Sequence, residues 1–205
     1  KANKFLEQCH VFLDETGDLE TPINKFSIDR LSLINFRKFI QLEISFDKHL
    51  TVLIGDNGSG KTTIVDSIAK TLSWISNGIE KEGKNGKPIN YSDINNSSEH
   101  YSEINSEFSF GNQASFKGNL SRAIQGASEK KDSKVAELKS LANIWRVANS
   151  HYEINLPVFT YYSVDRTTSH AKSTFSLEKF SDTKRESRFS SYSGYLEGSS
   201  KFSEF

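Results

Sequence analysis

The stretch LTVLIGDNGSGKTTIVDSIAKTL, from Leu50 to Leu72, changes its pattern twice. Its first residues form a nearly continuous apolar run, which is typical of a strand that is buried on both faces. A glycine-rich loop follows, and from Thr62 to Ile75 apolar residues recur at the three- and four-residue spacing of an amphipathic helix. The stretch therefore predicts a strand, a loop and a helix in immediate succession.

The loop GDNGSGKT, from Gly55 to Thr62, fits the pattern G-x-x-x-x-G-K-[ST] of phosphate-binding loops. Glycines let the backbone turn tightly and aim several N–H groups at one anion, and the helix that follows offers its positive end to the same phosphates. In this pattern Lys61 reaches the β- and γ-phosphates of a nucleotide, and the hydroxyl of Thr62 can coordinate Mg²⁺. Because the loop lies between a strand and a helix, we predict that it binds ATP and Mg²⁺ and is more than a structural turn.

Two pairs of strands are expected around this unit. Apolar and polar residues alternate in Phe26–Leu33 and again in Ile40–Phe46, which predicts an antiparallel pair. The run INSEFSFGNQASFKGNL, from Ile104 to Leu120, predicts two more strands around a Gly-Asn turn. With a helix predicted from Lys130 to about Ser150, the pattern indicates an α/β fold.

Three other segments complete the organisation. Lys1 to about Glu15 reads as a short amphipathic helix within an N-terminal extension of residues 1–25. Residues 77–102 are rich in Gly, Asn, Ser and Lys, which predicts a solvated insertion. The run LPVFTYYSV, from Leu156 to Val164, is aromatic and rich in strand-forming residues.

The segment from Ile28 to Ile75 resembles the N-terminal half of the ABC-type ATPases of the SMC, Rad50 and RecF group, because it combines NFRKF with GDNGSGKTT. The resemblance implies a P-loop NTPase with an ABC-type head, in which a mixed central sheet is joined by an antiparallel sub-sheet. It also implies that Arg37 lies near the nucleotide with Lys38 beside it, and that Asn57 lies beside the γ-phosphate. The alternative for Arg37 is a solvated turn residue.

The loop pattern and the resemblance together define the expected site. Lys61 is the expected catalytic residue, and Thr62 is the expected metal ligand. The residues expected to contact the nucleotide are Arg37, Lys38, Asn57, Gly58, Ser59, Gly60, Lys61, Thr62 and Thr63.

Two strings that complete an ABC-type site are absent from the sequence. There is no LSGG-like signature, and the nearest match to a Walker B strand, VFTYYSVDR, ends in Asp165 with Arg166 where a catalytic glutamate should stand. An ordinary core strand is the favoured interpretation of that run. We therefore expect residues 26–205 to be the N-terminal part of the ATPase domain, incomplete at its C-terminus, which binds ATP without efficient hydrolysis, whereas the intact protein is an ATP hydrolase.

The runs LPVFTYYSVDR and RFSSYSGYLEGSSKFSEF are similar to the ATPase subunits of the Septu (PtuA-like) and retron-associated anti-phage systems. This resemblance implies an oligomer of paired ATPase heads whose nucleotide state controls a partner nuclease of the HNH type. In a retron context it implies a reverse transcriptase with its RNA and DNA as further partners. Two alternatives remain: a RecF- or Rad50-like ATPase of DNA recombination or repair, and a nucleotide-clamped scaffold with little turnover.

The composition of the chain limits the partners and the cellular compartment that we expect. The 205 residues contain 26 basic and 26 acidic side chains, so the net charge of zero gives no global field that would attract nucleic acid. Cys9 is the single cysteine, which excludes an intrachain disulfide and fits a reducing compartment. No apolar run has the length of a membrane span, so we expect a cytoplasmic protein without a membrane partner.

Overall fold

A computed structural model describes residues 25–111, 114–127, 131–151 and 155–162. The predicted N-terminal helix, from Lys1 to about Glu15, lies outside these residues, and so does Asp165. Among the described helices, none combines the length and apolarity that crossing a bilayer requires.

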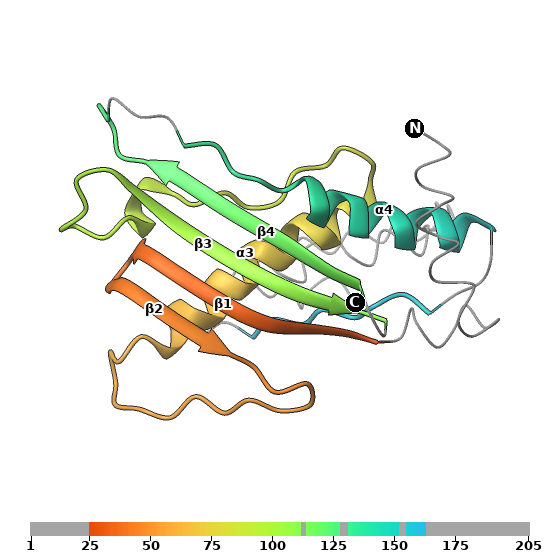
Figure 1. Cartoon of the computed structure of the whole chain (residues 1–205), viewed down its shortest axis with the longest axis horizontal. Helices are drawn as coiled ribbons and strands as arrows, with labels where there is room; N and C mark the ends of the chain where they lie inside the picture. Colours follow the sequence, from red (N-terminus) through yellow and green to blue (C-terminus); the bar gives the residue numbers. More distant parts are fainter. Residues whose placement is uncertain (1–24, 112–113, 128–130, 152–154, 163–205) are drawn as a thin grey trace, which may run out of the picture.

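The described residues form a four-stranded antiparallel sheet with the order β2-β1-β3-β4 (Figure 1). Both predicted strand pairs are confirmed. Their junction is the contact of β1 with β3, in which Leu33 faces Ile104 and both side chains are fully buried. The strands are β1 (Phe26–Phe36), β2 (Phe39–Ser45), β3 (Tyr101–Phe110) and β4 (Ala114–Ala123).

Two helices cover one face of this sheet, and Figure 1 shows them behind the strands. Helix α3 (Lys61–Glu80) continues beyond the predicted end at Ile75, and helix α4 (Ala136–His151) starts after the predicted Lys130. The extra turns of α3 pack on α4. Gly78 permits this contact, because a Cβ at this position would lie 2.7 Å from the Cβ of Ala142.

Aromatic side chains fill the space between the sheet and α4. Trp145 is fully buried and meets two rings edge-on, with centroid distances of 5.3 Å to Phe26 and 5.1 Å to Phe110. Such edge-to-face pairs stabilise the fold in addition to the stabilisation that comes from burying a large apolar area. The core of this part of the chain is therefore built from aromatics, which compensates for its modest apolar content.

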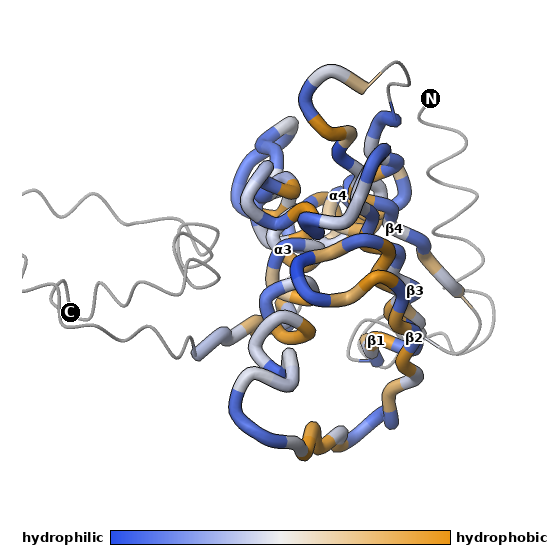
Figure 2. Tube along the Cα trace, turned by 90° about the vertical axis from the view of Figure 1, so that its left-hand side faces the viewer, coloured by the Kyte–Doolittle hydropathy of each residue, from blue (hydrophilic) through white to orange (hydrophobic). Residues whose placement is uncertain are grey.

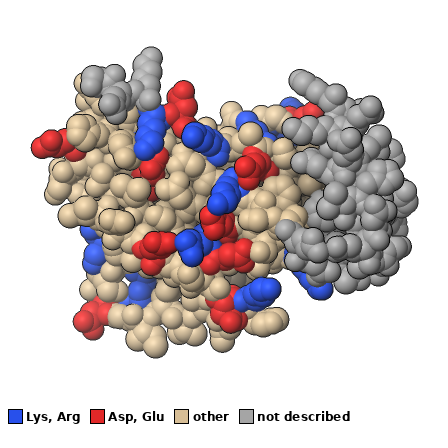
Figure 3. Space-filling view, viewed as in Figure 1, with Lys and Arg blue, Asp and Glu red and all other residues tan. Residues whose placement is uncertain are grey.

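The opposite face of the sheet carries charges of both signs. Arg30 pairs with Glu43 at 3.1 Å, and Lys117 pairs with Glu107 at 2.7 Å. Figure 3 shows the basic and acidic side chains interspersed across this face. Exposed pairs of this kind contribute little stability, and their charges largely cancel.

The prediction of a buried strand before the glycine-rich loop is wrong for the described structure. Residues 50–54 have no regular structure, and Leu50, Val52 and Ile54 are 73%, 66% and 92% exposed. Figure 2 shows this apolar segment at the bottom of the view, on a connection that swings away from the sheet. An apolar strand is buried only between neighbouring strands, and none of the described strands pairs with it. The expected mixed central sheet is accordingly not formed by the described residues.

The expectation of a solvated insertion between residues 77 and 102 needs correction as well. Its first residues belong to α3, and a 3₁₀ helix, η1 (Tyr91–Asp93), interrupts the remainder. Ile89, Asp93 and Ile94 are buried, with 1%, 3% and 9% exposure. The polar composition of the segment gives no sign of this burial, because the partners are distant in sequence: Ile94 bridges to Phe36 of β1, and Asp93 binds Arg37 of the β1–β2 turn.

Candidate functional site

The glycine-rich loop leads directly into the first turn of α3. Gly58 and Gly60 adopt positive φ values of 76° and 104°, which favour glycine. The N–H of Ser59 donates to the carbonyl of Asp56 at 3.1 Å and closes the turn. No side chain caps the helix at Gly60, and its first turn contains no acidic residue. The positive end of α3 is therefore available to an anion, as a phosphate requires.

Lys61 places a positive charge over the same loop. Its Nζ donates to the carbonyl oxygens of Gly55 at 2.6 Å and Asp56 at 2.7 Å. The hydroxyl of Ser59 lies 3.4 Å from this amine. The ammonium group and the helix N-terminus thus act on one small region, and these residues fit a bound phosphate.

The turn between β1 and β2 packs against this loop. Lys38 Nζ donates to the carbonyl of Gly58 at 2.5 Å. The ring of Phe39 lies so close to Gly60 that a Cβ there would be 2.4 Å from Cζ. The structure therefore places Lys38 at the phosphate-binding loop, although 20 residues separate Lys38 from Gly58.

Arg37 is held between two carboxylates and is not a solvated turn residue. Its Nε donates to Asp93 Oδ1 at 2.9 Å, and its Nη1 donates to Asp66 Oδ2 at 2.5 Å. Burial would lower the pKa of the guanidinium, but the hydrogen bonds and charges of both aspartates raise this pKa above its ordinary value. Arg37 thereby ties the β1–β2 turn to α3, one helical turn after Thr62.

Asp66 also connects the site to the segment Leu156–Tyr162. The hydroxyl of Tyr161 donates to Asp66 Oδ1. This segment is described without a strand, and Val158 in it is 85% exposed, so the strand-forming composition alone does not produce a strand here. Asp66 follows Thr62 by four residues, a spacing that places both on one helix face, and this signal could have identified Asp66 from sequence.

The remaining expected site residues differ in their surroundings. Asn57 and Thr62 are exposed, whereas Thr63 is buried, at 9% exposure. Thr62 is thus accessible to a metal ion that also binds phosphate oxygens, the arrangement that Mg²⁺ prefers in nucleotide sites. Within the described ranges, no group of three or more His, Cys, Asp or Glu side chains could hold a metal by itself.

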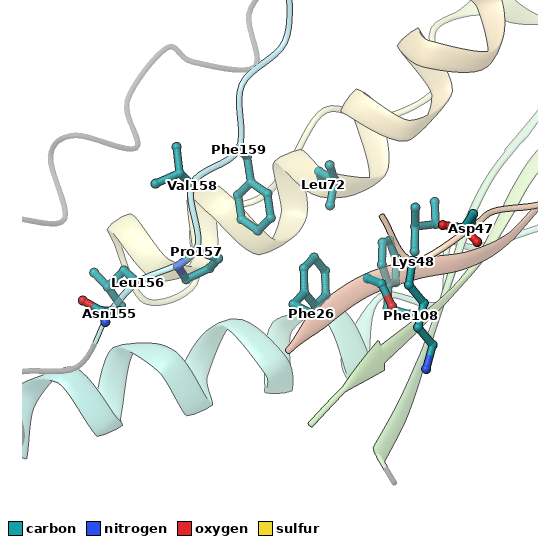
Figure 4. Close-up of a pocket in the computed structure, with 12 residues that line it drawn as sticks. Phe26, Asp47, Lys48, Leu72, Phe108, Asn155, Leu156, Pro157, Val158 and Phe159 are labelled. Carbon is teal, nitrogen blue, oxygen red and sulfur yellow. The ribbon is translucent and has the colours of Figure 1, made fainter. Parts of the chain in front are cut away.

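A cavity of about 410 Å³ lies near the start of β1, away from the phosphate-binding loop. Figure 4 shows Phe26 and Phe159 at this cavity, with Leu72 of α3 on one side. None of the residues 55–63 lines it. The cavity is therefore separate from the candidate phosphate site.

Comparisons with known proteins find relatives among ATPases. Over 80% of its length, this chain is 29% identical to the Retron Vc95 probable ATPase of Vibrio cholerae serotype O1 biovar El Tor, of which it covers 32%. Over 97% of its length it is 25% identical to the Retron Ec83 probable ATPase of Escherichia coli, of which it covers 37%. It is 49% identical to the DNA replication and repair protein RecF of Clostridium kluyveri over 41 residues, which are 20% of this chain and 11% of that protein.

The chain spans about a third of the length of the retron relatives that it matches. These matches confirm its resemblance to the RecF group of ATPases and to retron-associated ATPases. A family model described as an AAA domain matches residues 30–205, which include the phosphate-binding loop and the whole described sheet beyond the start of β1. The chain therefore belongs to the AAA domain family.

Proposed function

We propose that the intact protein binds ATP with Mg²⁺ at the loop Gly55–Thr62 and hydrolyses it. The observation that carries this proposal is the convergence of the loop, Lys61 and the N-terminus of α3 on one region, with Lys38 beside them. Lys61 and the loop N–H groups bind the phosphates, and Thr62 holds the metal. Mg²⁺, when bound, neutralises charge on the phosphate oxygens.

We propose that efficient turnover requires parts of the intact protein beyond the described residues. The support is that the sequence contains neither an LSGG-like signature nor a Walker B strand followed by a catalytic glutamate. We propose that residues 26–205 are the N-terminal part of an ABC-type head, preceded by an extension of residues 1–25. In this proposal Leu50–Ile54 becomes a strand of the mixed central sheet when the remainder of the domain is present, and the 205-residue chain alone binds ATP with little hydrolysis.

We infer further that the intact protein is the ATPase subunit of a bacterial anti-phage defence complex in the cytoplasm. The support is that similarity to retron probable ATPases extends over 80% and 97% of the chain. In this proposal the nucleotide state controls the pairing of two heads, and the paired heads control a partner nuclease of the HNH type. In a retron setting a reverse transcriptase with its RNA and DNA joins the complex.

A RecF-like role in DNA recombination or repair is the second candidate. It is favoured by the 49% identity to a RecF protein over 41 residues. The mixed charges on the outer face of the sheet count against direct DNA binding there, because phosphate backbones are bound by clustered positive charge (Figure 3). A nucleotide-clamped scaffold differs from both in that its turnover stays slow in the intact protein.

The test uses bacteria that carry the complete operon and are challenged with phage. Lys61→Ala is expected to abolish protection, whereas Lys117→Ala, which removes an exposed amine paired with Glu107, is expected to preserve it. Purification of the tagged intact protein is expected to recover the partner nuclease. Unchanged protection by Lys61→Ala, together with salt-sensitive binding of duplex DNA by the purified protein, would favour the repair role instead.

A further inference from the structure

Asp93 is a buried carboxylate, 3% exposed, that three donors share. Its Oδ1 accepts from Arg37 Nε at 2.9 Å, and its Oδ2 accepts from Lys70 Nζ and from the backbone N–H of Asn90, each at 2.9 Å. A carboxylate with this number of donors is stable in its charged form even when buried, and it fixes the positions of the cations that it binds.

Asp93 and Asn95 also form hydrogen bonds with the backbone of the β1–β2 turn. The N–H of Arg37 donates to the carbonyl of Asp93 at 2.6 Å, and the side-chain amide of Asn95 donates to the carbonyl of Arg37 at 2.5 Å. Asn35 and Arg37 have φ values of 48° and 50°, in the left-handed region that non-glycine residues seldom adopt. Such backbone strain persists only where the surrounding contacts impose it, so the residues around Asp93 determine the shape of the turn.

This turn is the element that meets the phosphate-binding loop. It carries Lys38, which is bonded to Gly58, and Phe39, which packs on Gly60. Arg37 donates from Nε to Asp93 and from Nη1 to Asp66, and its Cζ lies 5.5 Å from the centroid of the Phe36 ring. The two aspartates bind different sides of the guanidinium and thereby fix its plane and its position beside the β1–β2 turn.

We propose that Asp93 is a positioning residue for the nucleotide site: by holding Arg37 and the turn, it keeps the cations of Arg37 and Lys38 where the phosphates bind. Asp93 itself does not touch the nucleotide. This inference rests on the proposed ATP binding at the loop and assigns a role in it to a residue from the segment between α3 and β3.

The test compares two variants of the intact protein that weaken the same carboxylate cluster. Asp93→Asn removes the charge that holds Arg37, and we expect the Kd for ATP to rise about tenfold. Lys70→Gln removes the other cation bound to Asp93, on the helix side of the cluster, and we expect a lower Tm with an unchanged Kd. A merely structural role of Asp93 predicts instead that both variants lose affinity in proportion to their loss of Tm, and that result would overturn the proposal.

A double-mutant cycle tests whether Asp93 affects ATP binding through Arg37. If Asp93 acts through Arg37, adding Asp93→Asn to Arg37→Gln weakens ATP binding no further than Arg37→Gln alone, whereas additive losses contradict this route. If Asp93→Asn does not fold, the test uses Asp93→Glu instead, because the extra methylene displaces the carboxylate and keeps its charge. An unchanged Kd for ATP in Asp93→Glu refutes the proposal. Wild-type protein that fails to bind ATP, or binding that Lys61→Ala does not alter, refutes the proposed function itself.

Discussion

Lys38 donates a hydrogen bond from Nζ to the carbonyl oxygen of Gly58 at 2.5 Å and thereby joins the β1–β2 turn to the phosphate-binding loop. Lys61 bonds the same loop from its other end, through Gly55 and Asp56. Two amines from different elements therefore lie on one loop. We propose that both amines exchange loop carbonyls for phosphate oxygens when a nucleotide binds.

Replacing Lys38 by Met tests the contribution of the second amine. The substitution keeps most of the aliphatic chain and removes the charge, and we expect the Kd of the intact protein for ATP to rise about tenfold, the effect of one charge-assisted hydrogen bond. Lys117→Met is the matched control, since Lys117 pairs with Glu107 on the outer face of the sheet. Equal affinities of the two variants in isothermal titration calorimetry would show that Lys38 does not contact the phosphates.

Alanine at Gly60 is expected to damage the site more than alanine at Gly83. Both glycines have positive φ, 104° and 75°, so each substitution carries a backbone cost of about 1–2 kcal/mol. A Cβ at Gly60 would also lie 2.4 Å from the Phe39 ring, whereas a Cβ at Gly83 meets no atom within 4 Å. Gly60→Ala should therefore lose ATP binding and Gly83→Ala should retain it, as measured with a fluorescent ATP analogue. Similar affinities would contradict the packing of the turn on the loop.

The aromatic core predicts a large loss of stability on removal of Trp145. Trp145→Ala deletes a fully buried ring that contacts Phe26 and Phe110, and we expect the free energy of unfolding to fall by about 3–5 kcal/mol. Val158→Ala, at a position that is 85% exposed, should change it by less than about 0.5 kcal/mol. Urea unfolding followed by circular dichroism measures both, and a small effect of Trp145→Ala would place the core elsewhere.

The charge of Asp93 predicts how stability depends on pH. Burial would raise the pKa of Asp93, but the hydrogen bond from the Asn90 N–H and the interactions with Lys70 and Arg37 outweigh it, and the pKa lies below its ordinary value. Since the pKa is lower in the folded state, the stabilisation is complete above the unfolded pKa of about 3.9 and is lost as the pH falls through the folded value.

The difference in unfolding free energy between the wild type and Asp93→Asn should therefore be constant from neutral pH down to about pH 5 and shrink below about pH 4. Urea unfolding at a series of pH values measures this difference. A difference that instead grows as the solution is acidified would show that the folded state raises the pKa of Asp93.

The exposed apolar residues before the loop should behave differently in the short and the intact protein. Val52→Thr with Ile54→Thr removes apolar groups that are 66% and 92% exposed in the described structure. We expect this double variant of the 205-residue chain to keep its stability and bind less of a hydrophobic dye. In the intact protein the same changes should lower the Tm, because there the segment is proposed to be a buried strand. Equal Tm values for the intact wild type and variant would contradict that proposal.

Local patterns predicted much of this fold correctly. The alternation in β1 and β2, the two strands β3 and β4, and the helix α4 depend on patterns among neighbouring residues, so these patterns were sufficient to find them. Burial of the run at Leu50–Ile54 was predicted wrongly, because an apolar composition does not supply the neighbouring strands that burial requires.

The candidate site was also predicted only in part from the sequence. The loop motif identified Lys61 and Thr62, and the resemblance to the RecF group indicated that Arg37 and Lys38 lie near the loop. The ion pair of Asp93 with Arg37 was not predicted, because the two residues are 56 positions apart and Asp93 lies in a segment of polar composition. No local pattern distinguishes such a buried aspartate from the solvated residues around it.

The most direct test of the central claim is ATP binding and turnover, with Mg²⁺, by the 205-residue chain and by the intact protein, each compared with its Lys61→Ala variant. The account predicts that both wild-type proteins bind ATP, that only the intact protein hydrolyses it efficiently, and that Lys61→Ala removes both activities. Absence of ATP binding by the intact protein, or binding that persists unchanged in Lys61→Ala, would contradict it.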